Sequence, residues 1–410
     1  MRRTTWSFFI VLASITTLNY IDRANFGIVV PILMRRFSWT ISTVGVVSSL
    51  WAVGMLLGAL PLSYMADRIP ARRFLSWVVG LWSLCTATLG VSSVGWLFSL
   101  GRVGVGLFES PNFPVVTQLS GQAPNRRSGT ALGINGIGTG LGLIVGGPLS
   151  GLLLASWGWR GMFVGEAILG FALIACWRWI ASHTPVSSTA ASAHIMGPSL
   201  RWDTAAVRRT IAMTVAVFGA VFIAFWTLAW FPLFLKTNFG TSVVASSFYL
   251  VLPGLGAASG ALGGGLITDR ARRRAIHQHS LLRWWGGGLL LLAGLAMISA
   301  LWRIMTTTLI ALFLANFFIQ WLFVVIHLVA IDIGGPRATA RVDGIVQGAY
   351  GAGAVLSPVI NGLVIATRGF QHSIVVTGLV GLVSAISFVL LYRPAPRPAP
   401  SSAPQLEYVD

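Results

Sequence analysis

Four ionisable residues interrupt long apolar runs, where charged side chains are rare. Asp22 and Arg23 are adjacent in the first run, and Arg102 and Glu109 are seven positions apart in the fourth. An ionised side chain in the middle of a bilayer costs at least about 2.5 kcal/mol. A buried ion pair returns little of that cost as stability. We therefore expect these residues to serve transport rather than to form only a static ion-pair network.

Helical geometry gives the first apolar run two polar faces. Asp22 and Arg23 are separated by about 100° around a helix, Tyr20 shares the face of Arg23, and Asn19 shares the face of Asp22. The planar guanidinium of an arginine can bind both oxygens of a carboxylate. Tyr20 and Arg23 are therefore predicted to bind an anion, and Asp22 is predicted to take part in proton coupling.

The fourth apolar run adds a second pair of charges. Arg102 and Glu109 would lie about 10 Å apart along one side of a straight helix, too far to pair directly. We assign both to proton coupling and expect Arg102 to pair with Asp22 or with bound solute. Asn112, one turn beyond Glu109, is a candidate substrate ligand. Two prolines are expected to bend this helix: Pro111 and Pro114.

The composition is that of a membrane protein. Hydrophobic residues make up 55% of the 410-residue chain and charged residues only 9%, whereas soluble domains carry about 25% charged residues. Twelve apolar runs approach the length of about 20 residues that spans a bilayer as a helix. An all-α polytopic fold is therefore predicted, with helices near residues 7–31, 40–66, 73–93, 95–119, 129–155, 161–181, 207–235, 242–267, 281–301, 304–332, 339–366 and 369–392.

These runs fall into two halves joined by a polar segment. The predicted division is an N-terminal half over 1–181, a central cytoplasmic loop over 182–206, a C-terminal half over 207–392 and a disordered, proline-rich cytoplasmic tail over 393–410.

The basic residues orient the chain. Of its 28 Lys and Arg residues, Arg23 and Arg102 fall within helices, and all but six of the others fall on one side of the predicted membrane. Cytoplasmic loops carry such an excess, so both termini are expected in the cytoplasm, beneath the inner membrane. The six on the opposite side are Arg35, Arg36, Arg160, Lys236, Arg303 and Arg368.

A sequence feature recurs in the two halves. Asp67-Arg68 follows the second run, and Asp269-Arg270 follows the eighth, about 200 residues later; both pairs precede further arginines. Duplicated halves are common in transporters, which enclose a midplane site between them. We expect the two pairs to hold contacts at the cytoplasmic face and to govern conformational switching.

At this point the sequence resembles the major facilitator superfamily. Its signature loop matches residues 63–73, although Ser63 and Pro70 occupy glycine positions. Further motifs are similar to those of the anion:cation symporter branch, which includes galactonate, glucarate and hexuronate carriers. They are Asn19-Tyr20-Ile21-Asp22-Arg23, Gly101-Arg102, Glu109-Ser110-Pro111-Asn112-Phe113-Pro114 and Trp157-Gly158-Trp159-Arg160.

The resemblance implies a fold of twelve helices in two pseudo-symmetric six-helix halves. It implies that Arg23 binds a substrate carboxylate, and that Asp22 and Glu109 carry or couple protons. Gln347 matches a substrate-contacting position.

Two positions depart from the sugar-acid carriers. Thr139 stands where these often have Gln and is retained as a candidate ligand, and Met55 stands where they often have Tyr. Both departures argue against a substrate with many hydroxyl groups.

The function predicted is proton-coupled symport of a small organic anion, a sugar acid or another carboxylate, by a monomer in the lipid bilayer. Sodium-coupled symport and proton-driven drug export remain alternatives. An enzyme or a receptor is disfavoured, because the sequence offers no nucleophile with a nearby base, no phosphate loop and no signalling domain. No cofactor, metal or nucleic acid is expected.

Three further polar residues are predicted to lie outside the transport site. His327 is expected to be a satisfied core histidine rather than a titrating group. Glu166 is expected near a membrane interface, and Asp343 in a solvated position beside a loop.

Overall fold

The computed structural model describes residues 2–39, 41–121, 127–183, 202–241, 249, 251–274, 278–302 and 304–393. Helices and their connections make up this part of the chain, so the predicted all-α class is confirmed. The predicted central loop lies largely outside the described residues, because α6 continues to His183 and the description resumes at Trp202. The proline-rich tail beyond Arg393 also lies outside them.

The helices of the first part of the chain are α1 (Arg2–Phe37), α2 (Ile41–Ala66), α3 (Ala71–Val91), α4 (Gly95–Glu109), α5 (Asn112–Ser120) and α6 (Ser128–His183). The second part contains α8 (Thr204–Phe239), α10 (Val251–Arg274), α11 (Gln278–Ser299), α12 (Met305–Arg368), α13 (Phe370–Leu391) and a short 3-10 helix (Ala300–Trp302).

Within the described residues, ten helical segments are long and apolar enough to cross a membrane. The long helices α6 and α12 supply two each, and both are interrupted by a glycine with positive φ: Gly158 and Gly335. Two of the predicted runs fall on helices outside this set of ten. One is α1, which carries several charges, and the other is divided between α4 and α5.

The division of α4 from α5 occurs at the predicted prolines. Helix α4 ends at Glu109, and α5 begins at Asn112 after Pro111, whose φ and ψ are −84° and 1°. Proline lacks a backbone N–H and therefore interrupts the hydrogen-bond ladder of a helix. The expected bend is thus a break, located directly beside Glu109.

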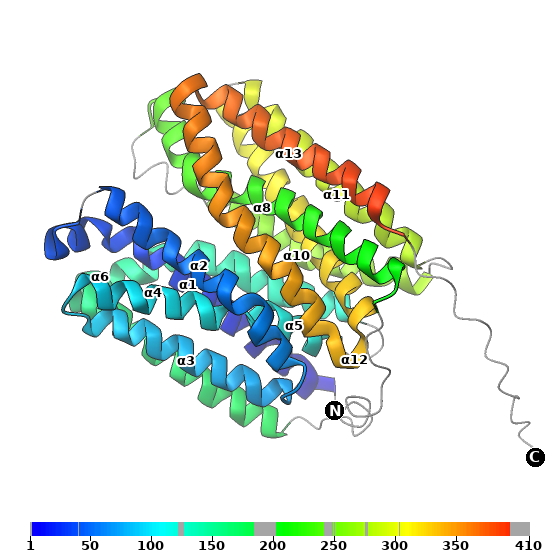
Figure 1. Cartoon of the computed structure of the whole chain (residues 1–410), viewed down its shortest axis with the longest axis horizontal. Coiled ribbons are helices and arrows are strands. Elements are labelled where there is room, and N and C mark those ends of the chain that lie inside the picture. The colour runs from blue at the N-terminus through cyan, green and yellow to red at the C-terminus, as the bar shows by residue number, and fades with distance from the viewer. Residues whose placement is uncertain are drawn as a thin grey trace, which may run out of the picture.

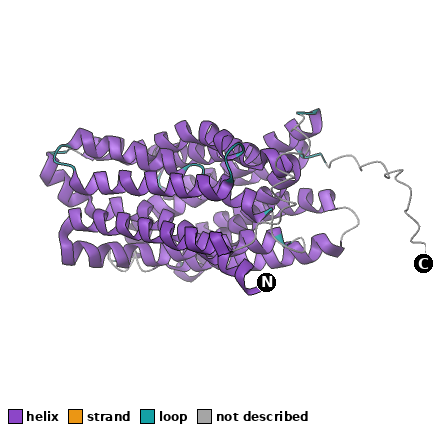
Figure 2. Cartoon of the chain, turned by 90° about the horizontal axis from the view of Figure 1, so that it is seen from below, coloured by secondary structure: helices purple, strands orange, loops and turns teal. Residues whose placement is uncertain are grey.

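Two groups of helices lie side by side (Figures 1 and 2). We call α1–α6 the N-terminal group and α8–α13, green to red in Figure 1, the C-terminal group. The C-terminal group has a large hydrophobic core of its own, and the N-terminal group has two smaller clusters. The groups meet where α12 contacts α2 and α5, and where α10 contacts α6.

Glycines bring the helices that carry the predicted site into close contact. A Cβ at Gly106 of α4 would lie 2.0 Å from the carbonyl oxygen of Trp51 in α2. A Cβ at Gly142 of α6 would lie 2.4 Å from the Cβ of Tyr20 in α1. Any larger residue would push these helices apart, so the glycines fix the positions of Trp51 and Tyr20 beside the charged residues.

Candidate functional site

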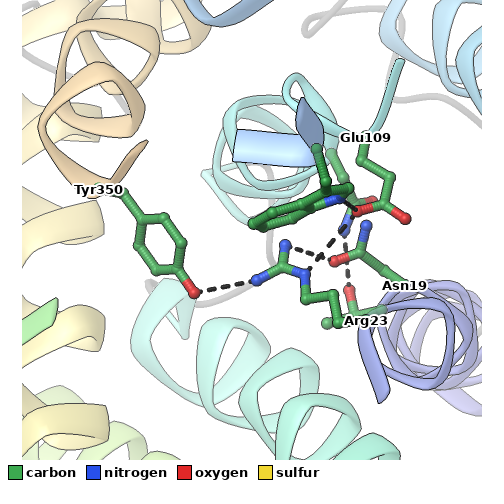
Figure 3. A network of polar contacts seen from close by, with 7 residues as sticks. Asn19, Arg23, Glu109 and Tyr350 are labelled. Carbon is green, nitrogen blue, oxygen red and sulfur yellow. Dashed lines mark hydrogen bonds and ion pairs between the residues drawn. The ribbon is translucent and has the colours of Figure 1, made fainter. Parts of the chain in front are cut away.

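Arg23 joins the two helix groups (Figure 3). Its Nη1 donates a hydrogen bond of 2.9 Å to the hydroxyl of Tyr350, which belongs to α12 of the C-terminal group. Its Nη2 donates one of 2.8 Å to Oδ1 of Asn19, one turn earlier in α1. Sequence geometry had placed Asn19 on the face of Asp22. Its hydrogen bond goes to Arg23, because residues four apart are nearly aligned on a helix and the long arginine reaches back to Asn19.

Aromatic rings surround the same guanidinium. Its Cζ lies 4.3 Å from the ring centroid of Tyr20, 4.7 Å from that of Trp51 and 5.7 Å from that of Tyr350. The negative face of an aromatic ring attracts a cation, and the attraction is stronger when both are withdrawn from water. The side chain of Arg23 is 13% exposed, so the charge is held in place but remains accessible.

Glu109 supplies the nearest opposite charge. Its Oε2 lies 3.8 Å from Nε of Arg23 and accepts a hydrogen bond of 2.9 Å from the indole Nε1 of Trp51. Its other oxygen, Oε1, is buried and has no hydrogen-bond partner. The carboxylate therefore makes a loose ion pair with Arg23, which another anion can replace.

Asp22 and Arg102 are buried nearby without forming a direct ion pair. Oδ1 of Asp22 and Nε of Arg102 have no hydrogen-bond partner, and no ion pair among the described residues joins them. Arg102 instead lies 4.6 Å above the ring of Phe26. The two charges remain within electrostatic range of each other and of Glu109.

The other predicted substrate ligands are dispersed. Asn112 lies inside the N-terminal group, where its Nδ2 is 3.4 Å from Oγ1 of Thr16, which in turn bonds Asn135. Thr139 is buried, and its hydroxyl has no hydrogen-bond partner. Gln347 is buried one turn before Tyr350 on α12. The structure does not bring Asn112 into contact with Arg23.

Two members of the site, Tyr350 and Trp51, did not emerge from the sequence. Both lie one helical turn from residues that did. Tyr350 follows Gln347 by three positions, and Trp51 precedes Met55 by four. Residues at these spacings share a helix face, and this signal could have identified them.

A second buried polar cluster crosses between the groups. Nδ1 of His327 lies 2.7 Å from Oδ1 of Asp343, both in α12. Thr117 of α5 approaches the pair, with Oγ1 at 3.1 Å from His327 Nδ1 and 3.3 Å from Asp343 Oδ2. His327 is therefore a buried, hydrogen-bonded histidine, as expected. The solvated position expected for Asp343 is wrong: the residue is fully buried, because α12 turns it toward α5.

Glu166 is also buried rather than interfacial. It accepts a hydrogen bond of 2.6 Å from Nδ2 of Asn25 and one of 2.7 Å from Oγ of Ser150. Polar side chains of α1 and α6 thus provide hydrogen bonds for this carboxylate inside the N-terminal group. The apolar sequence around Glu166 gives no sign of these partners.

The repeated Asp-Arg pairs make equivalent contacts between the groups. Asp67 accepts hydrogen bonds from the backbone N–H groups of Ala340 at 3.1 Å and Arg341 at 2.9 Å, and its Oδ2 lies 3.5 Å from Nε of Arg341. Burial raises the pKa of Asp67 to about 7, and the hydrogen bonds and charge of Arg341 oppose this rise. A carboxylate of the N-terminal group thus holds a turn of α12.

Asp269 makes the reciprocal contact. It accepts hydrogen bonds from the backbone N–H groups of Gly129 at 2.9 Å and Thr130 at 2.7 Å, and one of 2.6 Å from the hydroxyl of Thr130. These residues form the first turn of α6, where free N–H groups favour an anion. The arginines beside both aspartates, Arg68 and Arg270, are exposed, and Arg68 lies over the ring of Tyr64.

The C-terminal end of α1 lies far from the contacts of Asp67 and Asp269. It borders a cavity of about 430 Å³, which is lined by Ile32, Arg35, Arg36 and Trp159. The contacts of Asp67 and Asp269 thus join the two groups at one end, and this cavity lies at the other. Among the described residues, no cluster of three or more His, Cys, Asp or Glu side chains could hold a metal.

Known proteins resemble the chain along most of its length. The probable galactarate/D-glucarate transporter GudP of Bacillus subtilis (strain 168) is 24% identical over 430 residues, covering 96% of this chain and 92% of GudP. The probable sulfoacetate transporter SauU of Cupriavidus necator is 26% identical and covers 86% of this chain and 85% of SauU. Among solved structures, the human organic anion transporter MFSD10 (TETRAN) has a TM-score of 0.71 at 15% identity, covering 94% of this chain and 99% of that one.

The fold and the full-length relatives thus bear out the resemblance to sugar-acid carriers that the motifs indicated. The model of the Major Facilitator Superfamily matches residues 12–279. The chain belongs to the Major Facilitator Superfamily and is a multi-pass membrane transporter, not an enzyme.

Proposed function

We propose that the protein is a proton-coupled symporter that carries a small organic anion into the cytoplasm by alternating access. The observation that supports this most is the position of Arg23, a single accessible cation held between the two helix groups. An arginine at this place suits a carboxylate, because its planar fork bonds both oxygens. Relatives named as sugar-acid and sulfoacetate transporters agree with an anionic solute.

Coupling follows from competition for Arg23. Glu109, 3.8 Å from Arg23, occupies the position of a counter-ion. A proton that neutralises Glu109 frees the guanidinium to pair with the carboxylate of the solute, so the proton and the anion bind together. Asp22 is within electrostatic range of Glu109 and Arg102 and is assigned to the same proton pathway, and Arg102 balances the buried acids.

The contacts of Asp67 and Asp269 are assigned to gating. Each carboxylate holds a helix of the opposite group, so both contacts must break before the groups can separate at that end. We assign this end to the cytoplasm, and both termini with it, in the inner membrane. Arg35 and Arg36 then lie at the outer opening, where positive charge raises the local concentration of anions. The carrier needs no second copy for this cycle and is expected to act as a monomer.

The test uses the purified protein with benzoate, D-gluconate and D-glucarate as probes, measuring binding by thermal stabilisation and calorimetry. Replacing Arg23 with Ala should weaken binding of every acid that binds the parent, by at least about 30-fold. Arg23→Lys should recover only part of the binding affinity, because lysine lacks the planar guanidinium that bonds both carboxylate oxygens. Arg283→Ala is the matched control, since Arg283 binds the carbonyl of Val389 within the C-terminal group.

Coupling is tested separately in proteoliposomes. An inward proton gradient should drive accumulation of the acid that binds, whereas a sodium gradient at equal pH should not. Accumulation with sodium alone would favour the sodium-coupled alternative. Uptake driven by neither gradient, together with binding that is independent of Arg23, would contradict the proposed function.

A further inference from the structure

The side chains around Arg23 indicate what kind of solute could bind there. The inference rests on the proposed function, because it requires Arg23 to bind a carboxylate. Six side chains form a closed circuit in which each contacts the next, and five of them are aromatic rings. In order, they are Arg23, Tyr20, Phe113, His327, Phe323 and Tyr350.

The circuit crosses the boundary between the helix groups twice. Phe113 stacks on His327 with centroids 5.9 Å apart and ring planes 9° from parallel. On the opposite side, the hydrogen bond of Tyr350 with Arg23 makes the second crossing. Since both groups contribute three side chains each, a solute that contacts this circuit can contact both groups at once.

The remaining contacts are between rings of the same group. Tyr20 meets Phe113 edge to face, with centroids 6.4 Å apart. Phe323 lies 6.3 Å from His327 and 6.3 Å from Tyr350. Phe113, Phe323 and Tyr350 are only half-buried despite lying between the groups. Each of the three therefore keeps part of its surface uncovered.

Several hydrogen-bonding atoms around the circuit are already engaged, and two that have no partner, Nδ2 of Asn19 and Oε1 of Glu109, lie on the Arg23 side of it. The hydroxyl of Tyr350 and the amide oxygen of Asn19 accept from Arg23. Nδ1 of His327 is held by Asp343 and Thr117. A polyhydroxylated acid would have to bury several hydroxyls against rings, and a polar group buried without a partner weakens binding.

The positive charge available to the solute is also limited. Arg23 is the one guanidinium in the circuit, and Arg102 lies against Phe26 instead. A second carboxylate on the solute would be withdrawn from water without a cation of its own, which is strongly unfavourable. One carboxylate and an otherwise apolar, planar body satisfy this environment.

We propose that the preferred substrate is an aromatic monocarboxylate, with its carboxylate on Arg23 and its ring against Phe113, Phe323 and Tyr350. Aromatic rings favour stacked or edge-to-face neighbours at centroid separations of about 4.5–7 Å, and these three side chains offer such faces from both helix groups. The solute would therefore differ from the sugar acids named for GudP.

The experiment compares two acids of equal charge with a third that carries one more negative charge. Benzoate carries one carboxylate on a ring, and D-gluconate carries one on a polyhydroxylated chain; D-glucarate adds a second carboxylate. Calorimetry on the full-length protein should give benzoate a dissociation constant at least about tenfold lower than that of either sugar acid. Arg23→Ala should abolish binding of benzoate.

Two substitutions test the ring contacts while keeping an apolar side chain of similar size. Phe323→Leu and Phe113→Leu should each reduce the preference for benzoate over gluconate to within about threefold. Phe218→Leu is the control, since Phe218 is also half-buried but pairs with Phe222 away from the circuit. The Phe218→Leu variant should prefer benzoate over gluconate as strongly as the parent does.

Different results would overturn the aromatic substrate and the anion site. Gluconate or glucarate binding as tightly as benzoate, and through Arg23, would overturn the aromatic substrate and leave the anion symporter intact. The aromatic substrate would also be overturned if both leucine variants kept the full preference. If none of the three acids bound in an Arg23-dependent manner, the anion site itself would be wrong.

Discussion

Ser63 of α2 and Gly344 of α12 lie face to face where the two helix groups meet. A Cβ on Gly344 would lie 2.4 Å from the Cβ of Ser63 and 2.7 Å from the carbonyl oxygen of Ala59. In the equivalent contact, Gly265 lies against Gly129. The serine that departs from the signature loop is therefore accommodated by a glycine on the opposite helix.

Replacing Gly344 with Ala should open this contact. The added methyl overlaps α2, and overpacking of this kind typically costs about 1–3 kcal/mol. The conformation closed at this end should lose that stability, and transport should slow. Gly348→Ala, one turn further along α12, is the control because its Cβ would meet nothing within 4 Å. Adding Ser63→Gly to Gly344→Ala should restore part of the uptake. If it restored none, the loss of uptake would not come from the contact between residues 63 and 344.

The contact of Asp67 should depend on pH. Its pKa is about 7 in the closed contact and should return to its ordinary value of 3.8 once the contact opens to water. The closed form therefore binds the proton more tightly. Its extra stability is fully present below about pH 4 and is lost as pH rises through about 7, changing the ratio of closed to open forms by up to about tenfold per pH unit.

Spin labels on cysteines replacing Arg73 and Arg273 can measure this ratio, because both residues are exposed, in opposite groups, and shortly follow Asp67 and Asp269 in the chain. Cys85 and Cys176 would first be replaced by Ala. Short distances should predominate at pH 5 and decline toward pH 8. Asp67→Asn, which cannot titrate, should abolish the trend. Short distances that become more frequent from pH 5 to pH 8 would contradict the assignment.

Glu109→Gln should separate exchange from accumulation. Glutamine resembles the protonated acid, so Arg23 stays free to bind the solute, but no proton can be released. Counterflow, with solute on both sides, should persist, and uphill uptake driven by a proton gradient should be lost. Uphill uptake at the parental rate would mean that protons travel by another route or that the coupling ion is different.

The buried His327–Asp343 pair should stabilise closure through Thr117. Hydrogen bonds to a charged group contribute about 1.5–3 kcal/mol, and those of Thr117 join the two groups. Thr117→Val should therefore shift the labelled protein toward the open form by roughly tenfold or more. Thr227→Val is the control, since Thr227 bonds only within α8, to Ile223. If the two substitutions had equal effects, the His327–Asp343 pair would have no role in closure.

Sequence patterns predicted the fold and the buried charges because both depend on local information. Apolar runs mark helices that face lipid, and the charge of Arg23 inside such a run is costly wherever the chain folds. The break at Pro111 also follows from local chemistry. These features need no knowledge of which helices become neighbours.

The partners of the charges depend on tertiary packing. Tyr350 is 327 positions from Arg23, and nothing in either segment specifies that they meet. Asp343 lies near arginines in the sequence, which suggested solvent, yet α12 carries it against α5. The serine at position 63 could be recognised as a departure from the signature, but its accommodation by Gly344 required the structure.

The loose pair of Arg23 and Glu109 also bears on the electrical character of the cycle. When a proton neutralises Glu109 and one monocarboxylate neutralises Arg23, the loaded site has the same net charge as the site in which the two residues pair with each other. Uptake with one proton would then be insensitive to membrane potential. Each additional proton would carry a charge across the field and add about 2.3 kcal/mol of driving force per 100 mV. The voltage dependence of uptake therefore reports how many protons accompany each anion.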